Sequence, residues 1–159
     1  MSDLIVPTLA APLDETNAEA SQNRLGFSVP RLLTRLYSLV GNGGFGPGYG
    51  LLGLLGGVAD EQGYNAIELY ELNSLGDPGD PDFSWPDKLL PICHWGCAIY
   101  SCIDCESETG AVITFDPNLH DKSWSQCFVP TRHTFETWLD RWAAGASLWD
   151  EMYPQGQET

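Results

Sequence analysis

Basic residues are scarce in this chain. Seven of its 159 residues are lysine or arginine, against 22 aspartates and glutamates, which gives a formal net charge of −15 at pH 7. A protein that binds DNA or RNA needs a basic stripe to neutralise phosphates, so direct nucleic-acid binding is not expected. An anionic membrane surface would repel the chain for the same reason. The charge instead favours solubility, or long-range attraction to a partner with a basic face.

Long apolar runs and an export signal are also missing. The most apolar segment, residues 51–55, is short and contains a glycine, whereas a membrane helix needs about 18 apolar residues. Near the start, Asp3 stands where an export signal would carry a basic residue, and Pro7 interrupts a short apolar run. We therefore expect a cytoplasmic protein that does not bind membranes.

The cysteines are odd in number, whereas a secreted domain held by disulfides normally has an even count. Reduced thiols are therefore expected. Four of the five lie close together in the sequence, at Cys93, Cys97, Cys102 and Cys105. Zinc sites use two closely spaced ligand pairs on turns, but residues three apart on one strand point to opposite faces. We predict small buried thiols, no metal and no cofactor, with a metal- or thiol-dependent enzyme using residues 93–105 as an alternative.

Composition predicts one folded domain. Apolar residues make up 43% of the chain, which contains six Trp, six Tyr and six Phe, so a disordered chain is excluded. A length of 159 residues is sufficient for one domain with a substantial core. We expect a loose lead-in over residues 1–12, the domain over residues 13–153 and a tail over residues 154–159.

Four helices are predicted from apolar spacing and capping residues. The first covers residues 13–25, with Asp14 as its cap, and the second follows Pro30. We expect Gly43 or Gly44 to have a positive φ and to close the second helix. The third covers residues 66–75 after Asn65, with Ile67, Tyr70 and Leu75 towards the core. The fourth begins after Thr134 and buries one face that carries Phe135, Trp138, Leu139, Trp142 and Ala146.

Strands are predicted over residues 49–54, 89–93, 97–104 and 111–116. Helices therefore come first, strands lie in the middle and helices end the chain. This order is typical of an α+β fold, and it differs from the strand–helix alternation of a doubly wound parallel sheet.

Three motifs, taken in order, resemble the SUKH superfamily, whose members are named for Smi/Knr-type regulators and include many bacterial immunity proteins. The first is the leucine-rich helix followed by Asn42-Gly43-Gly44 and an apolar segment. The second runs from Trp85-Pro86 through Pro91 to Trp95-Gly96, and the third is Phe-Glu-x-Trp-Leu at residues 135–139. The resemblance covers about residues 25 to 150. It implies a single α+β domain, a mainly antiparallel sheet with helices packed before and after it, and structural roles for Asn42, Gly43, Gly44, Pro91 and Trp138.

No catalytic constellation emerges from the spacing of residues. Two GxGxxG matches follow a helix and precede a strand, which reverses the order that dinucleotide binding requires. The three histidines, His94, His120 and His133, are too scattered to predict a ligand set. A non-enzymatic binding module is therefore favoured over an enzyme.

The resemblance implies an immunity protein that neutralises a bacterial polymorphic toxin, possibly a nuclease, by direct binding. An intracellular regulatory scaffold of the Smi/Knr type is the alternative. The expected partner is a cognate toxin or another protein with a basic face. Two acidic connections, residues 76–88 and 104–110, supply the candidate contacts Asp77, Asp80, Asp82, Trp85, Asp104, Glu106 and Glu108. Trp85 either covers the sheet or is exposed at the partner site.

Overall fold

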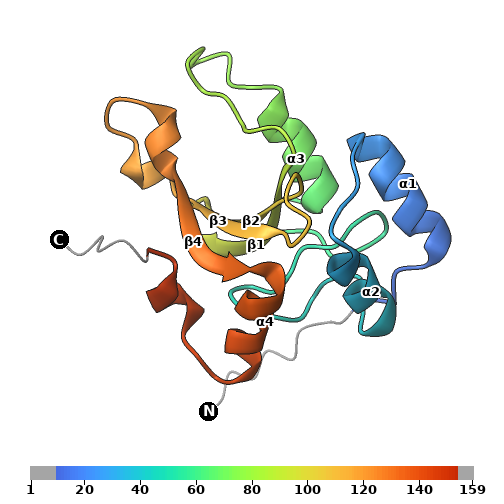
Figure 1. The fold of residues 1–159 in the computed structure, drawn as a ribbon. Helices are drawn as coiled ribbons and strands as arrows, with labels where there is room; N and C mark the ends of the chain where they lie inside the picture. Colours follow the sequence, from blue (N-terminus) through green and yellow to red (C-terminus); the bar gives the residue numbers. More distant parts are fainter. Residues whose placement is uncertain (1–9, 154–159) are drawn as a thin grey trace.

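The fold is a single α+β domain built on a four-stranded antiparallel sheet, as predicted (Figure 1). A computed structural model describes residues 10–153, so the predicted tail and most of the predicted lead-in lie outside the described residues. The strands follow the sequence order across the sheet. They are β1 (Leu89–Gly96), β2 (Ile99–Asp104), β3 (Ala111–Phe115) and β4 (Phe128–Thr134).

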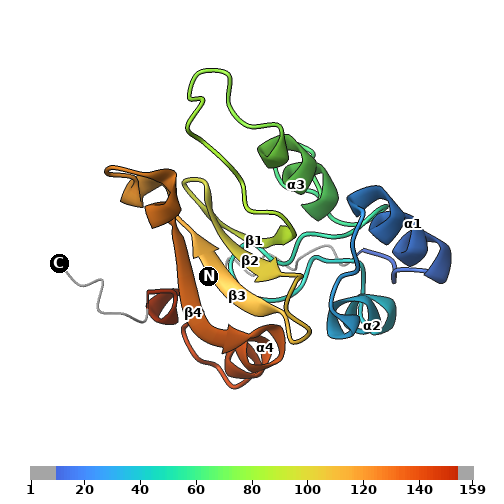
Figure 2. The ribbon, with the colours of Figure 1, turned by 45° about the horizontal axis from the view of Figure 1, so that its top comes forward.

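Three helices precede the sheet and one follows it: α1 (Glu15–Leu25), α2 (Arg31–Leu39), α3 (Ala66–Ser74) and α4 (Phe135–Ala143). Helix α3 contacts β1, α4 contacts β3 and β4, and α2 contacts α4. Short 3₁₀ turns occur at η1 (Pro117–Leu119), η2 (Trp124–Cys127) and η3 (Leu148–Glu151). Figure 2 shows α1 and α2 together on one side of the molecule. Within residues 10–153, no helix has the length and apolarity needed to cross a membrane.

The two faces of the sheet are both covered, because side chains alternate along each strand. One face joins the main core, which includes Leu90, Ile92, Ile103, Trp138 and residues of α2 and α3. The other face forms a second apolar cluster around Trp85, Leu89, Cys102, Phe115 and Cys127. Trp138 is 2% exposed, which confirms its predicted burial.

The predicted caps of three helices are confirmed. The Asp14 side chain accepts a hydrogen bond from the Asn17 N–H at 2.7 Å, and Gly26 ends α1 at φ 83°. Asn65 and Thr134 each form a capping box at the start of α3 and α4. These side chains satisfy backbone N–H groups that the first helical turn leaves without partners.

The glycines after α2 have a role different from the predicted one. Gly43 and Gly44 both have φ 90°, so the positive φ is confirmed. However, α2 ends at Leu39, and its C-cap Val40 has a right-handed conformation, so neither glycine closes the helix. They instead allow the next segment to fold back. A Cβ on Gly43 would lie 2.7 Å from the Leu51 carbonyl oxygen.

The predicted strand over residues 49–54 is wrong. Only Leu51 forms an isolated bridge, opposite Cys93 of β1. Gly50, inside this segment, has a φ of 95°, which an extended strand does not contain. The segment nevertheless buries Leu51, Leu52 and Leu54 against the sheet.

Asn42 satisfies the backbone of this irregular segment. Its side-chain oxygen accepts from the Leu54 N–H at 2.8 Å, and its Nδ2 donates to the Leu55 carbonyl at 2.9 Å. The Asn42 carbonyl also accepts from the Val58 N–H at 3.0 Å. Asn42 is 3% exposed, so water cannot supply these bonds in its place.

Other boundaries also differ from the predictions. Strand β4 was not predicted. Cys97 and Ala98, assigned to a strand, form the β1–β2 turn with φ values of 52° and 60°. Leu75 and Trp142, predicted to be buried, are 83% and 39% exposed. Leu75 is the C-cap of α3, where the chain leaves the helix, and the buried residues of α4 are in its first four positions.

Pro91 lies in β1 opposite Cys102 and is buried. A proline has no N–H to donate, so it is tolerated in β1 because this is an edge strand of the sheet. The register between β1 and β2 shifts immediately after it.

We expect Asn42→Ala to lower the free energy of unfolding by about 2–5 kcal/mol, because it leaves a buried donor and a buried acceptor without partners. Urea unfolding followed by tryptophan fluorescence measures this change. Asn23→Ala, on the exposed surface of α1, is the matched control and should change stability by less than about 0.5 kcal/mol. Equal effects of the two variants would contradict the role of Asn42.

Gly43 and Gly26 provide a second matched pair, because both have a positive φ. A Cβ on Gly26 meets nothing within 4 Å, whereas one on Gly43 meets backbone atoms at 2.7 and 2.8 Å. Gly26→Ala should therefore cost only the conformational strain, about 1 kcal/mol. Gly43→Ala should cost distinctly more in the same unfolding measurement. If both alanines cost the same, the close approach at Gly43 is not significant.

Candidate functional site

The two acidic connections predicted to bind a partner meet where the Lys88 carbonyl accepts from the Cys105 N–H at 2.8 Å, but their acidic residues lie at opposite ends of the sheet. The connection between β2 and β3 begins beside the Asp104–Ala111 pair. Asp80, in the loop between α3 and β1, accepts a hydrogen bond from Trp124 Nε1 at 2.8 Å. Trp124 belongs to the β3–β4 connection, which starts at the other end of β3. The structure therefore separates the candidates into two groups.

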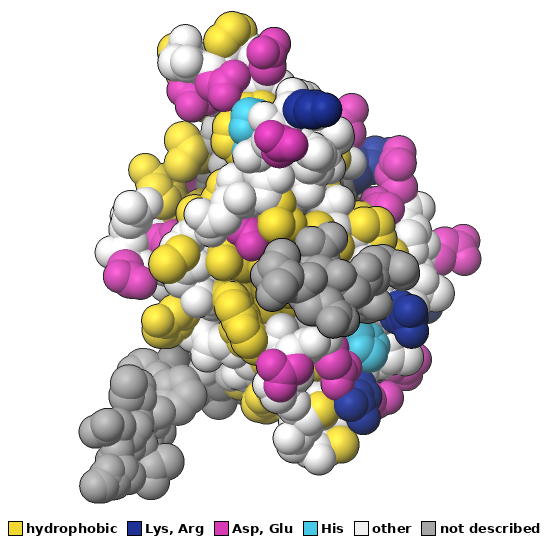
Figure 3. All heavy atoms as spheres, turned by 90° about the vertical axis from the view of Figure 1, so that its left-hand side faces the viewer, with side chains coloured by type: hydrophobic (Ala, Val, Ile, Leu, Met, Phe, Trp, Pro, Cys, Tyr) yellow, Lys and Arg dark blue, Asp and Glu magenta, His cyan; other side chains and the backbone are white. Residues whose placement is uncertain are grey.

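The α3–β1 loop, residues 75–88, projects from the molecule (Figure 1), and acidic side chains gather at its tip (Figure 3). Two of its carboxylates shape the loop. Asp77 accepts from the Gly79 N–H at 2.8 Å, and Asp80 accepts from the Asp82 N–H at 3.1 Å. Asp82 is exposed. A hollow of about 390 Å³ borders this group and is lined by Asp82, but not by Asp77 or Asp80.

Trp85 is not exposed at either group. It is 5% exposed, its Nε1 donates to the Leu89 carbonyl at 2.7 Å, and its ring packs edge-on against Phe115 and Phe128. Of the two interpretations that the sequence left open, the structure shows the first, in which Trp85 covers the sheet. A buried Trp85 cannot contact a partner directly, but it holds the end of the α3–β1 loop in place.

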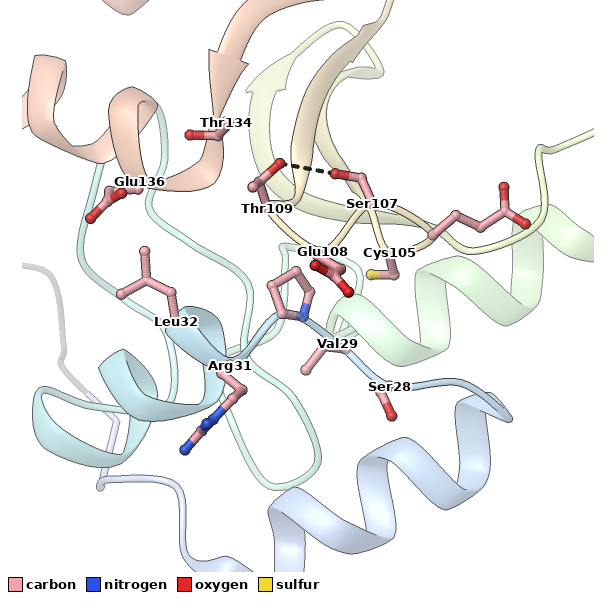
Figure 4. Close-up of a pocket in the computed structure, with 12 residues that line it drawn as sticks. Ser28, Val29, Arg31, Leu32, Cys105, Ser107, Glu108, Thr109, Thr134 and Glu136 are labelled. Carbon is pink, nitrogen blue, oxygen red and sulfur yellow. Dashed lines mark hydrogen bonds between the residues drawn. The ribbon is translucent and has the colours of Figure 1, made fainter.

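The β2–β3 turn borders a groove of about 680 Å³, lined also by the starts of α2 and α4 (Figure 4). We call this the glutamate groove. Val29, Pro30 and Leu32 give it an apolar wall. Its acidic residues are Glu106 and Glu108 from the turn and Glu136 from α4, all exposed. The sequence identified the two turn glutamates, but it gave no sign that Glu136 would join them.

Gly110 holds the three walls of the groove together. Its carbonyl accepts from the Phe135 N–H at 2.8 Å, which attaches the turn to the start of α4. A Cβ on Gly110 would lie 3.0 Å from both Pro30 and Ile103, so the turn also packs closely against the start of α2. The glycine has φ 70°, which disfavours any other residue. The backbone that carries the glutamates is thus anchored to the starts of α2 and α4.

Hydrogen bonds inside the turn fix its shape. The Asp104 carboxylate accepts from the Glu106 N–H at 3.0 Å, and Ser107 Oγ accepts from the N–H of Gly110 at 3.1 Å. Asp104 therefore shapes the turn, while Glu106 and Glu108 remain available to a partner. Arg31 also lines the groove, but Figure 4 shows its side chain pointing away from the turn. It forms no ion pair within the part of the chain that the structure describes.

The structure places the cysteines in different environments. Cys93 and Cys102 are buried, Cys105 is half-buried and Cys97 is exposed in the β1–β2 turn. All five thiols are free. Burial raises the pKa of Cys93 and of Cys102, and burial followed by the charge of Asp104 raises the pKa of Cys105 to about 12. Among residues 10–153, no three His, Cys, Asp or Glu side chains are grouped to hold a metal ion.

One group has the connectivity of a catalytic triad, which the sequence did not reveal. His133 lies 3.2 Å from Thr137 Oγ1 through Nδ1 and 2.8 Å from Glu151 through Nε2. Thr137, however, belongs to the capping box of α4, where its hydroxyl contacts the Thr134 N–H and carbonyl. Glu151 also pairs with Arg141, and hydrogen bonds from Arg141 and then His133 lower the pKa of Glu151. The group therefore attaches η3 to α4.

A model of the SMI1 / KNR4 family (SUKH-1) matches residues 12–141. The match includes α1 to α3, the whole sheet, residues 135–141 of α4 and all the residues that line the glutamate groove. No curated protein and no solved structure gave a significant match. The chain belongs to the SMI1 / KNR4 family.

The thiol environments lead to a labelling prediction. At pH 8, iodoacetamide should modify Cys97 first, because a thiol with a pKa of about 12 is ionised in only about one molecule in 10,000. Cys93 and Cys102 should react only in denaturant. Peptide mass spectrometry gives the order, with Cys97→Ser as the control. One zinc ion retained per chain would contradict this arrangement and support the metal-dependent alternative.

Proposed function

We propose that this SUKH-1 protein is a non-enzymatic immunity protein, which neutralises a bacterial polymorphic toxin in the cytoplasm by direct binding. Family membership supports a protein partner of this kind. The observation that carries the proposal is the glutamate groove, where Glu106, Glu108 and Glu136 come from two elements locked together at Gly110. The proposed functional unit is residues 13–153.

The charge of the chain points to the kind of toxin. A nuclease binds its substrate through a basic surface, because it must neutralise phosphates. Carboxylates carried on an anchored backbone present clustered negative charge, as a phosphate track does. A net charge of −15 also speeds the encounter with a basic protein. A nuclease toxin is therefore the class that the acidic surface suits best.

The two acidic groups have different proposed roles. The groove glutamates make close contacts in the bound complex, so they control dissociation. Asp77, Asp80 and Asp82 lie on the projecting α3–β1 loop and supply long-range attraction, so they control association. Trp85 and Asp104 contribute indirectly, because one supports the loop and the other shapes the turn.

If a toxin is encoded beside its gene, the proposal predicts that the chain protects cells that produce this toxin. A variant with Glu106→Gln, Glu108→Gln and Glu136→Gln should lose this protection. Surface plasmon resonance with an inactive form of the toxin should show dissociation faster by about tenfold or more, because close charge pairs are lost.

The matched control is Glu15→Gln, Glu19→Gln and Asp150→Asn. These residues are exposed, none lines the groove, and Glu15 matches Glu136 as a glutamate in the first turn of a helix. The control should keep protection and change dissociation by less than about twofold. Equal loss in both variants would contradict the groove. Binding of a partner without any protection would favour the regulatory scaffold.

A further inference from the structure

A row of aromatic rings crosses one face of the sheet, with one ring from each strand. His94 is paired with Tyr100, Tyr100 with Phe115, and Phe115 with Phe128. Neighbouring ring centres are 5.3, 6.5 and 5.0 Å apart. Trp85 covers the β4 end of this row.

The β1 end of the row is open. Tyr49 extends it beyond the edge strand, with its ring centre 5.5 Å from that of His94. Its side chain is 72% exposed, yet its N–H donates to the His94 carbonyl at 3.1 Å, which fixes the backbone. A large exposed ring on a fixed backbone is the kind of side chain that dominates the binding energy at protein interfaces.

Two adjoining hollows of about 130 and 270 Å³ lie at this open end. Both are lined by Asp60, Glu61 and His94; Tyr49 lines the smaller one and Tyr100 the larger. We call this region the aromatic hollow. No lysine or arginine lines it, and its carboxylates form no ion pair among the described residues. A lysine or arginine that pairs with them must therefore come from another molecule.

The Asp60 carboxylate is held in place before any ligand arrives. Its Oδ1 accepts from the N–H groups of Gln62 and Tyr64, both at 2.9 Å. Within the described residues its Oδ2 has no hydrogen-bond partner. Burial raises the pKa of Tyr100, and the negative charge of Asp60 raises it further. The Asp60 carboxylate is therefore close enough to the aromatic row for its charge to be felt at Tyr100.

We propose that the aromatic hollow is a second protein-contact site, separate from the glutamate groove, which takes an arginine side chain of a partner. The guanidinium stacks on the exposed flank of Tyr49, His94 and Tyr100, while Asp60 and Glu61 accept its N–H groups. Only the identity of the partner rests on the proposed function; the chemistry of the hollow does not.

Arginine fits this hollow better than other cations. Its guanidinium is planar, weakly hydrated and able to stack on a ring while donating to a carboxylate at its edge. Lysine has a compact, strongly hydrated charge that needs no flat surface. The rings stand in a row, tilted by 34° and 33° from their neighbours. They do not surround a space, as a cage for quaternary ammonium groups would.

The test uses a short glycine peptide with one central arginine and two otherwise identical peptides with lysine or trimethyl-lysine. Each is titrated into the ¹⁵N-labelled chain and followed by NMR. The arginine peptide should shift the signals of Tyr49, Asp60, His94 and Tyr100, and it should bind more tightly than either of the other two peptides. Tyr49→Ala and Asp60→Asn should each weaken binding by about fivefold.

Two controls separate the alternatives. Tyr49→Phe keeps the ring and should bind normally. The test variant Asp60→Asn keeps an oxygen that can hold the same turn, so its fold is preserved. Asp82→Asn removes a remote charge and should have no effect. Equal binding of arginine and lysine, or tighter binding of trimethyl-lysine, would overturn the proposal.

The groove variant distinguishes this proposal from the proposed function. Replacing Glu106, Glu108 and Glu136 by glutamine should leave arginine-peptide binding unchanged, because these residues do not line the hollow. If that variant lost peptide binding while Tyr49→Ala kept it, the arginine would bind in the groove. The hollow would then be excluded and the groove supported.

Discussion

The buried side chain of Asn42 makes the rest of the fold possible. Residues 41–58 form no regular helix or strand, yet they place three leucines in the core beside β1. A backbone buried without secondary structure must find other hydrogen-bond partners. Asn42 supplies them, and it lies so close to the chain that a Cβ on Gly53 or Gly57 would fall within 2.4–2.5 Å of its atoms. The glycines are thus a consequence of this contact, and the same packing carries Tyr49 to the edge of the sheet.

Local signals in the sequence predicted the helices well, because their caps are local. Asp14, Asn65 and Thr134 act within three residues of their own positions, and apolar spacing identified the buried positions Ile67, Phe135 and Trp138. The predictions were wrong where tertiary contacts decide the outcome. Residues 49–54 are apolar enough for a strand, but Gly50 has a positive φ and Gly53 packs against the Asn42 carbonyl. Strand β4 is an edge strand that contains Pro130 and polar residues, so its sequence lacks the apolar alternation that predicts a strand. The apolar spacing of α4 continues to Trp142, beyond its buried residues.

The candidate sites were harder to predict, because they are assembled from distant segments. The turn glutamates could be found as acids on a loop, whereas Glu136 joins them only because Gly110 receives the Phe135 N–H. Trp85 follows an acidic loop in the sequence but is drawn into the core by Phe115 and Phe128. The aromatic hollow depends on strand register, which aligns His94 with Tyr100, and on the loop that carries Asp60. Neither the pairing of His94 with Tyr100 nor the position of the Asp60 loop has a local sequence signal.

The few basic residues determine where the negative charge remains unbalanced. Arg24 pairs with Glu71 and Arg141 with Glu151, so two of the seven cations neutralise acids that join elements of the fold. The groove and the hollow keep their carboxylates without an ion pair among the described residues. Charge attracts a basic partner over a long range but selects weakly among such partners. Selection needs short-range shape, and here the two surfaces differ: one has an apolar wall beside glutamates, and the other has a row of rings. A partner that matched only the charge would bind neither tightly.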